Sequence, residues 1–143
     1  MSDDSHLRRF NRLIGEINAV YHDIASRFGL SDSAFQIIYT LYVEGGSCQL
    51  RDICFFSGLT KQTVNSALRN LEREEIVTGE KCGPKQKIIS LTAYGADLAE
   101  HTVARVIAAE NKIFGSWTDA ELKNYLHLTE EYLIAMRKSA GGL

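Results

Sequence analysis

The stretch that decides the fold of this chain is LRDICFFSGLTKQTVNSALRNLEREEIVTGEKCGPKQKIISLT, residues 50–92. It predicts a short helix over 50–57, a turn at Gly58 and a longer helix that begins after Thr60. Gly58 can adopt the left-handed conformation that a tight turn between two helices needs. Thr60 is a typical N-cap residue, since its hydroxyl can accept a hydrogen bond from the first turn. The segment therefore has the pattern of a helix-turn-helix.

The longer helix has one apolar and one polar face. Apolar residues recur at intervals of three and four, at Val64, Ala67, Leu68 and Leu71, which predicts a face buried in the domain. The opposite face, called here the outer face, collects Gln62, Ser66, Arg69 and Arg73, with Asn65 and Asn70 on its flanks. Such side chains can hydrogen-bond to base edges or to phosphates. We therefore interpret this helix as one that reads DNA.

A basic hairpin follows the longer helix. Ile76-Val77 and residues 88–91 are β-prone runs, joined through residues 81–85. Lys81, Lys85 and Lys87 lie at or near the tip of this hairpin. A hairpin with basic residues after a helix-turn-helix is typical of the wing of a DNA-binding domain, so the wing strengthens the DNA-binding interpretation.

Length and composition predict one domain over residues 1–143. The chain has 143 residues, 45% of them hydrophobic, and a single proline. No apolar run approaches the roughly 18 residues that a membrane span needs, and the polar N-terminus has no apolar signal region. The three cysteines, Cys48, Cys54 and Cys82, have no CxxC spacing. An odd number of cysteines without such spacing favours the reducing cytoplasm. We thus expect a cytoplasmic protein with no membrane partner.

The charge distribution supports a nucleic-acid partner more than the net charge does. The whole chain carries −2 at pH 7. Between Lys61 and Lys87, however, six basic residues stand against four acidic ones, so this segment carries +2. The positive charge is concentrated in the helix and hairpin that we expect to contact DNA.

Amphipathic helices flank the winged segment on both sides. A first helix over about 5–28 precedes Gly29, and a second helix that starts at Ser31 is apolar around most of its girth, which predicts the central buried helix. Residues 47–49 form a short extended segment that could pair with the wing. The two flanking regions, about 5–28 and 93–138, carry more apolar surface than the winged segment can cover. We expect them to form a dimerisation layer with a second copy of the chain.

The C-terminal region shows two helix starts. Thr92 can cap a long helix that reaches about Gly115. Thr118 and Glu121 have the spacing of a capping box for a last helix. The apolar residues that this last helix should bury are Leu122, Tyr125, Leu126, Tyr132, Leu133 and Met136.

The order of these elements resembles the MarR (multiple antibiotic resistance regulator) family over nearly the whole chain. The resemblance is most specific in GLTKQTVNSALRNLEREEIV and in SLTAYGADL, which is similar to the leucine-threonine-x-x-glycine junction between wing and long helix in that family. It implies a mainly α fold with a small β wing, the winged helix-turn-helix lying over about 31–92. It also implies a homodimeric transcriptional regulator, a repressor, that binds a pseudo-palindromic operator in double-stranded DNA. A small aromatic or lipophilic effector would release the DNA.

The same resemblance assigns residues to DNA. Gln62, Thr63, Asn65, Ser66 and Arg69 match the major-groove residues of the family. The wing departs from the family, which has an Asp-x-Arg where this chain has Gly83 and Lys85, so phosphate contact by Lys85 or Lys87 replaces minor-groove reading. The full predicted set is Lys61, Gln62, Thr63, Asn65, Ser66, Arg69, Arg73, Lys81, Lys85 and Lys87.

The first helix of the helix-turn-helix also departs from the family pattern. Phe55 and Phe56 stand where that family tends to have charged residues, and Ser57 replaces a usual leucine. We expect one phenylalanine to turn inward and fill the leucine's space. The alternative is an exposed patch for a partner.

No catalytic, metal or cofactor site is predicted. The four histidines have no HExxH-like spacing, and a thiol-dependent enzyme built on Cys82 would lack a nearby residue that could serve as the base. The residues of an effector site stay open, because Phe35, Tyr21, Tyr39 and Tyr42 have the helical spacing of core aromatics. Two alternatives remain: a winged-helix module that binds proteins, and a redox sensor that uses the exposed thiol of Cys82.

Overall fold

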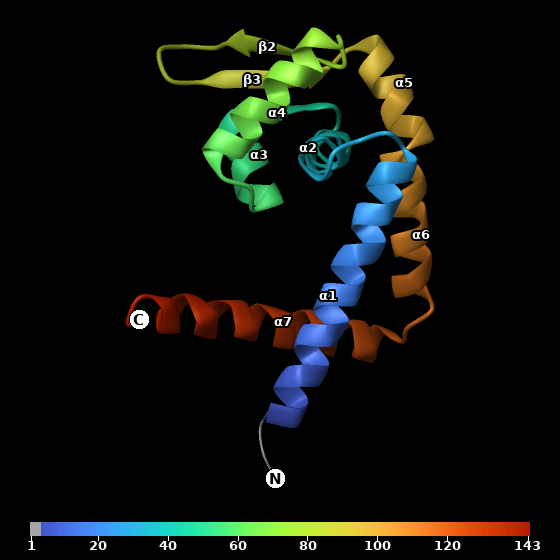
Figure 1. Ribbon diagram of the computed structural model, residues 1–143, viewed down its shortest axis with the longest axis vertical. Coiled ribbons are helices and arrows are strands. Elements are labelled where there is room, and N and C mark those ends of the chain that lie inside the picture. The colour runs from blue at the N-terminus through green and yellow to red at the C-terminus, as the bar shows by residue number, and fades with distance from the viewer. Residues whose placement is uncertain (1–3) are drawn as a thin grey trace. The chain divides into compact units, whose positions relative to one another are not determined.

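The computed structural model describes residues 4–143, and the chain divides into two compact units, Met1–Arg105 and Val106–Leu143. The fold is mainly α-helical with one small antiparallel sheet, as predicted (Figure 1). The first unit holds α1 (Asp4–Arg27), α2 (Asp32–Val43), β1 (Ser47–Gln49), α3 (Leu50–Ser57), α4 (Lys61–Arg73), β2 (Val77–Lys81), β3 (Lys87–Leu91) and α5 (Ala93–His101). α6 (Val103–Gly115) begins in the first unit, and α7 (Asp119–Ala140) lies in the second. None of these helices is both long and apolar enough to cross a membrane.

Helix α2 is the core of the first unit, as its sequence predicts. Its buried residues are Ala34, Phe35, Ile37, Ile38, Thr40 and Leu41. The Ser31 hydroxyl caps the helix by accepting a hydrogen bond from the Ala34 N–H at 3.1 Å. Gly45 and Gly46, both with positive φ, turn the chain after the helix. Both helices of the helix-turn-helix, α3 and α4, pack on α2, so α2 fixes their positions.

The wing is part of a three-stranded sheet with strand order β1-β3-β2. The predicted pairing of residues 47–49 with the wing is confirmed, since Cys48 lies opposite Ile89 in an antiparallel register. Strand β2 continues to Lys81, which pairs with Lys87, so the hairpin is longer than the sequence suggested. Ile76 is buried immediately before β2 rather than within it. The connecting loop is therefore 82–86, with a positive φ at Gly83.

A compact junction ties the end of α4, the sheet and the start of α5 together. The Thr92 hydroxyl accepts from the Gly95 N–H at 2.9 Å, as an N-cap, and donates to the Glu75 carbonyl at 2.6 Å. The Thr92 N–H donates to the Ile76 carbonyl at 3.0 Å. Gly95 lies so close to Ile76 that a Cβ added there would overlap the Ile76 carbonyl group. This contact explains physically why a threonine is followed by a glycine three residues later.

The predicted long helix from Thr92 to Gly115 is interrupted, so that prediction is wrong in its continuity. Thr102 has φ −126° and ψ −88° and separates α5 from α6. Its hydroxyl donates to the Leu98 carbonyl at 2.7 Å, and its N–H bonds to the Ala99 carbonyl three residues back. Hydroxyl bonds to the preceding turn and i→i−3 backbone bonds both favour bends in helices.

The second unit holds most of α6 and all of α7. The capping box between Thr118 and Glu121 is confirmed, and hydrogen bonding to the Thr118 N–H, followed by hydrogen bonding to the Thr118 side chain, lowers the pKa of the Glu121 carboxyl. Phe114, Trp117 and Tyr125 contact one another edge to face or tilted, with ring centroids 5.3–6.5 Å apart. No residue of α7 is buried. The predicted burial of its apolar residues is therefore wrong for the single chain, in which most of them are exposed.

The Thr92 junction yields a stability prediction. Gly95→Ala should lower the free energy of unfolding by about 3 kcal/mol, the upper end of overpacking costs, because the new methyl group meets backbone that cannot rotate away. Gly15→Ala is the matched control, since a Cβ there meets nothing within 4 Å, and it should raise stability by up to about 1 kcal/mol. Urea denaturation at one protein concentration measures both. Equal stabilities for the two variants would contradict the close approach at Ile76.

Candidate nucleic-acid interface

Helix α4 is held firmly along its apolar face. The Thr60 hydroxyl accepts from the Thr63 N–H at 3.1 Å, which confirms the predicted N-cap. Val64, Leu68 and Leu71 are at most 3% exposed, and the helix packs on α2. Each such side chain contributes about 1.5–3 kcal/mol when it is fully buried. The opposite face is therefore presented in one fixed orientation.

The outer face of α4 is polar and accessible. Lys61, Gln62, Ser66, Arg69 and Arg73 are exposed, whereas Thr63 and Asn65 are half-buried. Within the described part of the chain, the side chains of Gln62, Asn65, Ser66 and Arg69 make no hydrogen bond or ion pair. The hydroxyl of Thr63 accepts a hydrogen bond from the Thr60 hydroxyl at 2.8 Å, so its own hydrogen can still be donated to a partner. The donors and acceptors of this face are thus available to an external partner.

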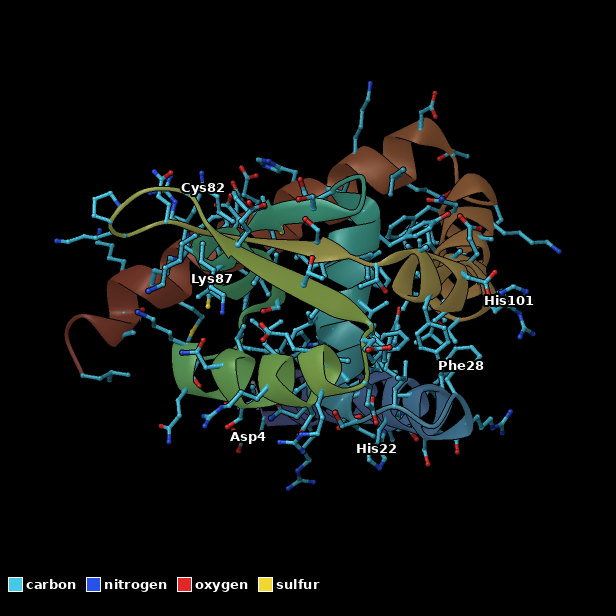
Figure 2. All side chains as sticks on the ribbon, turned by 90° about the horizontal axis from the view of Figure 1, so that it is seen from above. Asp4, His22, Phe28, Cys82, Lys87 and His101 are labelled. Carbon is cyan, nitrogen blue, oxygen red and sulfur yellow. The ribbon has the colours of Figure 1, made fainter. Side chains whose placement is uncertain are left out.

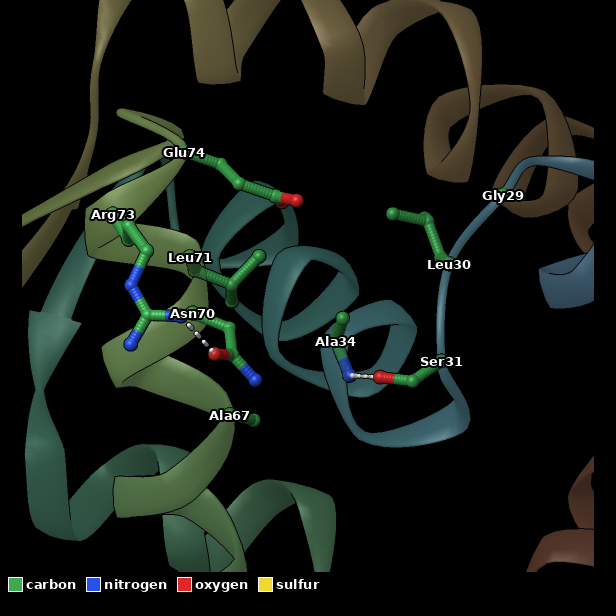
Figure 3. Close-up of a pocket in the computed structure, with 9 residues that line it drawn as sticks. All are labelled: Gly29, Leu30, Ser31, Ala34, Ala67, Asn70, Leu71, Arg73 and Glu74. Atoms are coloured by element: carbon green, nitrogen blue, oxygen red, sulfur yellow. Dashed lines mark hydrogen bonds between the residues drawn. The ribbon is translucent and has the colours of Figure 1, made fainter.

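Arg73 differs from the rest of the outer face. Its guanidinium donates to the Asn70 side-chain oxygen at 3.3 Å. Both residues line a shallow depression of about 250 Å³ between the end of α4 and the start of α2, with Leu30, Ala34 and Leu71 among its apolar residues (Figure 3). Sequence reasoning placed Arg73 with the DNA-contacting residues, and the structure turns it partly toward this depression.

The three wing lysines do not share one environment. Lys81 is exposed at the end of β2, and Lys85 is exposed in the loop. Lys87 is half-buried on β3 (Figure 2). Its Nζ lies 3.6 Å from Glu72 Oε1 of α4. Gly79 gives it room, since a Cβ there would come within 2.5 Å of Lys87 Cε. Lys87 therefore ties the wing to α4, a role that the sequence did not indicate.

A cleft lies between the wing and the helix-turn-helix. It has a volume of about 390 Å³ and is lined by Gln49, Leu50, Arg51, Cys54, Lys61, Lys85, Gln86 and Lys87. It brings together three of the predicted DNA-contacting residues, Lys61, Lys85 and Lys87, from two separate elements. Arg51, Gln49 and Gln86 were missed, because their convergence depends on the pairing of β1 with β3. We call this the cationic cleft.

Phe55 and Phe56 do not fill the space that Ser57 leaves, so that prediction is wrong. Phe55 is 72% exposed and Phe56 57% exposed, and their rings meet edge to face at 5.3 Å. Ile53 occupies the inward direction of α3, and at about 100° per residue Phe55 points away from it. Phe56 lies about 60° from the direction of Ile53 and is nevertheless exposed. The Ser57 hydroxyl instead accepts from the Leu59 N–H at 3.2 Å in the turn.

Within residues 4–143, the thiols and histidines lie apart from one another or on the surface. Cys82 is exposed near the wing tip, as predicted (Figure 2), while Cys48 and Cys54 are half-buried. Burial, followed by the charges of Asp52 and Glu44, raises the pKa of the Cys48 thiol to about 11. His22 bonds to Asp32 at 2.9 Å on the surface. Among residues 4–143, no three His, Cys, Asp or Glu side chains are grouped so that they could hold a metal ion.

Residues 28–86 match the model of the MarR family. Among solved structures, NMB1585, a MarR family regulator from Neisseria meningitidis, is 21% identical with a TM-score of 0.83, covering 95% of this chain and 96% of its own. MepR from S. aureus, solved as a DNA complex, is 19% identical with a TM-score of 0.69 and covers 95% and 98%. NadR, solved with 4-hydroxyphenylacetate, is 17% identical with a TM-score of 0.67 and covers 91% and 90%. None of the curated proteins matches this sequence.

The fold and the polar outer face of α4 define a winged helix-turn-helix protein of the DNA-binding class. The family model matches the segment that carries this face, and the similar structures share the fold over nearly the whole chain. Residues 28–86 thus match the MarR family of transcriptional regulators, and the chain shares the fold of solved MarR family regulators. The resemblance seen in the sequence is thereby confirmed.

Proposed function

We propose that this chain is a homodimeric, sequence-specific repressor whose α4 enters the major groove of a pseudo-palindromic operator, in the cytoplasm where that DNA lies. The observation that carries the proposal is the outer face of α4, whose polar side chains are exposed or half-exposed on a helix fixed from behind by Val64, Leu68 and Leu71. An α-helix fits the major groove of B-DNA, where each base pair presents a distinct pattern of donors and acceptors.

The roles within the interface follow from side-chain chemistry. Gln62 and Asn65 carry amides that can pair with adenine through two hydrogen bonds, and Arg69 can pair likewise with guanine. Thr63 and Ser66 offer hydroxyls to either kind of base. Lys61, Arg73, Lys81, Lys85 and Lys87 contribute charge toward phosphates, which positions the protein without reading sequence. The amide and hydroxyl side chains thus specify the operator, and the cations strengthen binding.

The dimer is supported by apolar surface that a single chain leaves open. On α1 the exposed apolar residues are Leu7, Phe10, Leu13, Ile14, Ile17 and Val20. In the second unit they include Ile113, Tyr125, Leu126, Leu128, Leu133, Ile134 and Met136. Each unit by itself thus carries a helix with many exposed apolar side chains, and large exposed apolar patches are rare on monomeric proteins. We propose that residues 1–143 act as one domain. Residues of about 5–28 and 93–138 form the dimer layer, and the winged helix-turn-helix of each chain lies over about 31–92.

Selection of duplexes from a random-sequence pool tests sequence reading and dimerisation together. The enriched sites should be two-fold symmetric, with half-site centres about one DNA turn or roughly 34 Å apart, because two copies of α4 related by a dyad must reach successive major grooves. Sedimentation of the same preparation at micromolar concentration should give a species of twice the 16.0 kDa chain mass. A pool that stays random, or a species of one chain mass only, would contradict the proposal.

We further propose that a small aromatic or lipophilic effector releases the operator. NadR, with the same fold, was solved with 4-hydroxyphenylacetate. In a dimer, the spacing between the two copies of α4 must match the DNA turn, so a ligand that stabilises another spacing lowers operator affinity. Regulation would then act on the geometry of the dimer and not on the outer face itself.

Effector coupling can be measured with a panel of small phenolic and aromatic acids that begins with 4-hydroxyphenylacetate. A ligand that raises the melting temperature should also weaken operator binding, by the 5- to 150-fold typical of allosteric coupling. Operator DNA should weaken ligand binding by the same factor, because the coupling is reciprocal. Stabilising ligands that leave operator affinity unchanged would refute release by such effectors.

A further inference from the structure

The cationic cleft lies directly beside the outer face of α4. Lys61, the first residue of α4, forms part of its wall, and Asn65 lies one turn further along the same helix. Arg51 enters from the first turn of α3, and Lys85 and Gln86 enter from the wing loop. Three elements, α3, α4 and the wing, thus surround one space of about 390 Å³.

The charge of this space is strongly biased. Its lining includes four cationic side chains, Arg51, Lys61, Lys85 and Lys87, and no acidic one, in a chain whose net charge is −2. Two carboxylates stand nearby: Glu72 lies 3.6 Å from Lys87, and Asp52 lies 4.0 Å from the Arg51 Nε. Within the described residues, Lys61 and Lys85 make no ion pair. The cleft therefore keeps an excess of positive charge.

The chemistry of the lining suits a phosphate group. A guanidinium and ammonium groups bind phosphate oxygens through charge-assisted hydrogen bonds, and the amides of Gln49 and Gln86 add neutral donors. The start of α4 contributes the positive end of its helix dipole. Leu50 and Cys54 supply the apolar part of the lining.

We propose that the cationic cleft holds a backbone phosphodiester of the operator, with Arg51 as a phosphate contact that anchors the strand between α4 and the wing. This inference rests on the proposed function, since it needs DNA on the outer face. A DNA phosphate is favoured over a free phosphate compound because the cleft is continuous with α4. A DNA strand that runs from α4 to the wing would pass over the cationic cleft. Arg51 then fixes the register in which Asn65 and Gln62 meet the bases.

The test uses Arg51→Gln, whose side chain is 79% exposed and therefore not needed for folding. Each phosphate contact contributes about 0.9 to the slope of log K against log salt. Loss of one contact in each protomer should thus reduce this slope by about 2, on selected and on scrambled duplexes alike. The preference for the selected duplex should stay unchanged. Lys85→Gln, in the wing loop, should behave in the same way.

Two variants control for charge and for folding. Arg27→Gln removes an equally exposed arginine, 78% accessible on α1 and outside the cleft, and should leave the slope unchanged. Arg51→Lys should restore most of the slope, because an ammonium can still contact phosphate. Equal melting temperatures for Arg51→Gln and the unaltered chain are expected.

The outcomes separate this inference from the proposed function. If the chain binds DNA sequence-specifically but Arg51→Gln and Lys85→Gln leave the salt slope unchanged, the proposed phosphate contact in the cleft is wrong, while the proposed repressor function still stands. Absence of specific DNA binding by the unaltered chain would overturn both. Calorimetry with inorganic phosphate, in the absence of DNA, tests whether the cleft binds a free phosphate compound instead of a DNA phosphate. Micromolar phosphate binding that Arg51→Gln abolishes, combined with unchanged salt slopes, would assign the cleft to a free phosphate and overturn the DNA contact.

Discussion

The burial of one face of α4 against α2 is the constraint on which the rest of the structure depends. Val64, Leu68 and Leu71 are removed from solvent almost completely, and the α2 residues behind them form the centre of the core. Rotation of α4 about its axis would expose these three side chains, at a cost of several kcal/mol by their transfer free energies. Burial of the apolar face therefore fixes the orientation of the polar residues on the opposite face of α4. Recognition of base edges needs this rigidity, since hydrogen bonds to bases tolerate little displacement.

Polar contacts then fix the other elements of the first unit relative to α4. Glu72 reaches Lys87 of the wing, while Thr92 joins the Glu75 and Ile76 carbonyls to the start of α5. Glu75 itself has a φ of 61°, which turns the chain sharply out of α4. The Tyr42 hydroxyl donates to Glu100 at 3.0 Å and connects α2 to α5. A change in the position of α5 would therefore move the end of α4 as well, which is the coupling that the proposed release by an effector would need.

Local signals in the sequence predicted most of the fold. Caps at Ser31, Thr60, Thr92 and Thr118 mark helix starts because each hydroxyl satisfies an N–H within its own first turn. The limits of α3 followed from Gly58 and from its apolar spacing. The break at Thr102 was missed because threonine is compatible with a helix, and only its hydroxyl bond to Leu98 reveals the bend. Phe55 was misjudged because hydrophobicity was given more weight than its direction on α3, which is opposite to Ile53. Phe56 lies nearer the direction of Ile53, and helical spacing alone does not reveal its exposure.

The proposed interface could be predicted from the sequence where it lies on one element, and it could not where several elements converge. The outer face of α4 can be read from helical periodicity alone. Arg51 could not be found in this way, because its meeting with Lys61 and Lys85 depends on how β1 pairs with β3 and on where the wing loop ends. From the sequence, Lys87 was expected to contact only DNA. Its contact with Glu72 was not predicted, because it arises from packing of the wing against α4.

The central claim is that the outer face of α4 reads bases, and Asn65→Ala tests it most directly. Binding to the selected operator and to single-base variants of it should be measured across a salt series, with Asn70→Ala, on the flank facing the α2 depression, as the control. The account predicts that Asn65→Ala loses about 1–3 kcal/mol of discrimination at one base pair per half-site while the salt slope stays nearly unchanged. If Asn65→Ala instead weakens all sequences equally, or lowers the salt slope while keeping discrimination, then α4 does not read the operator through this residue and the account is contradicted.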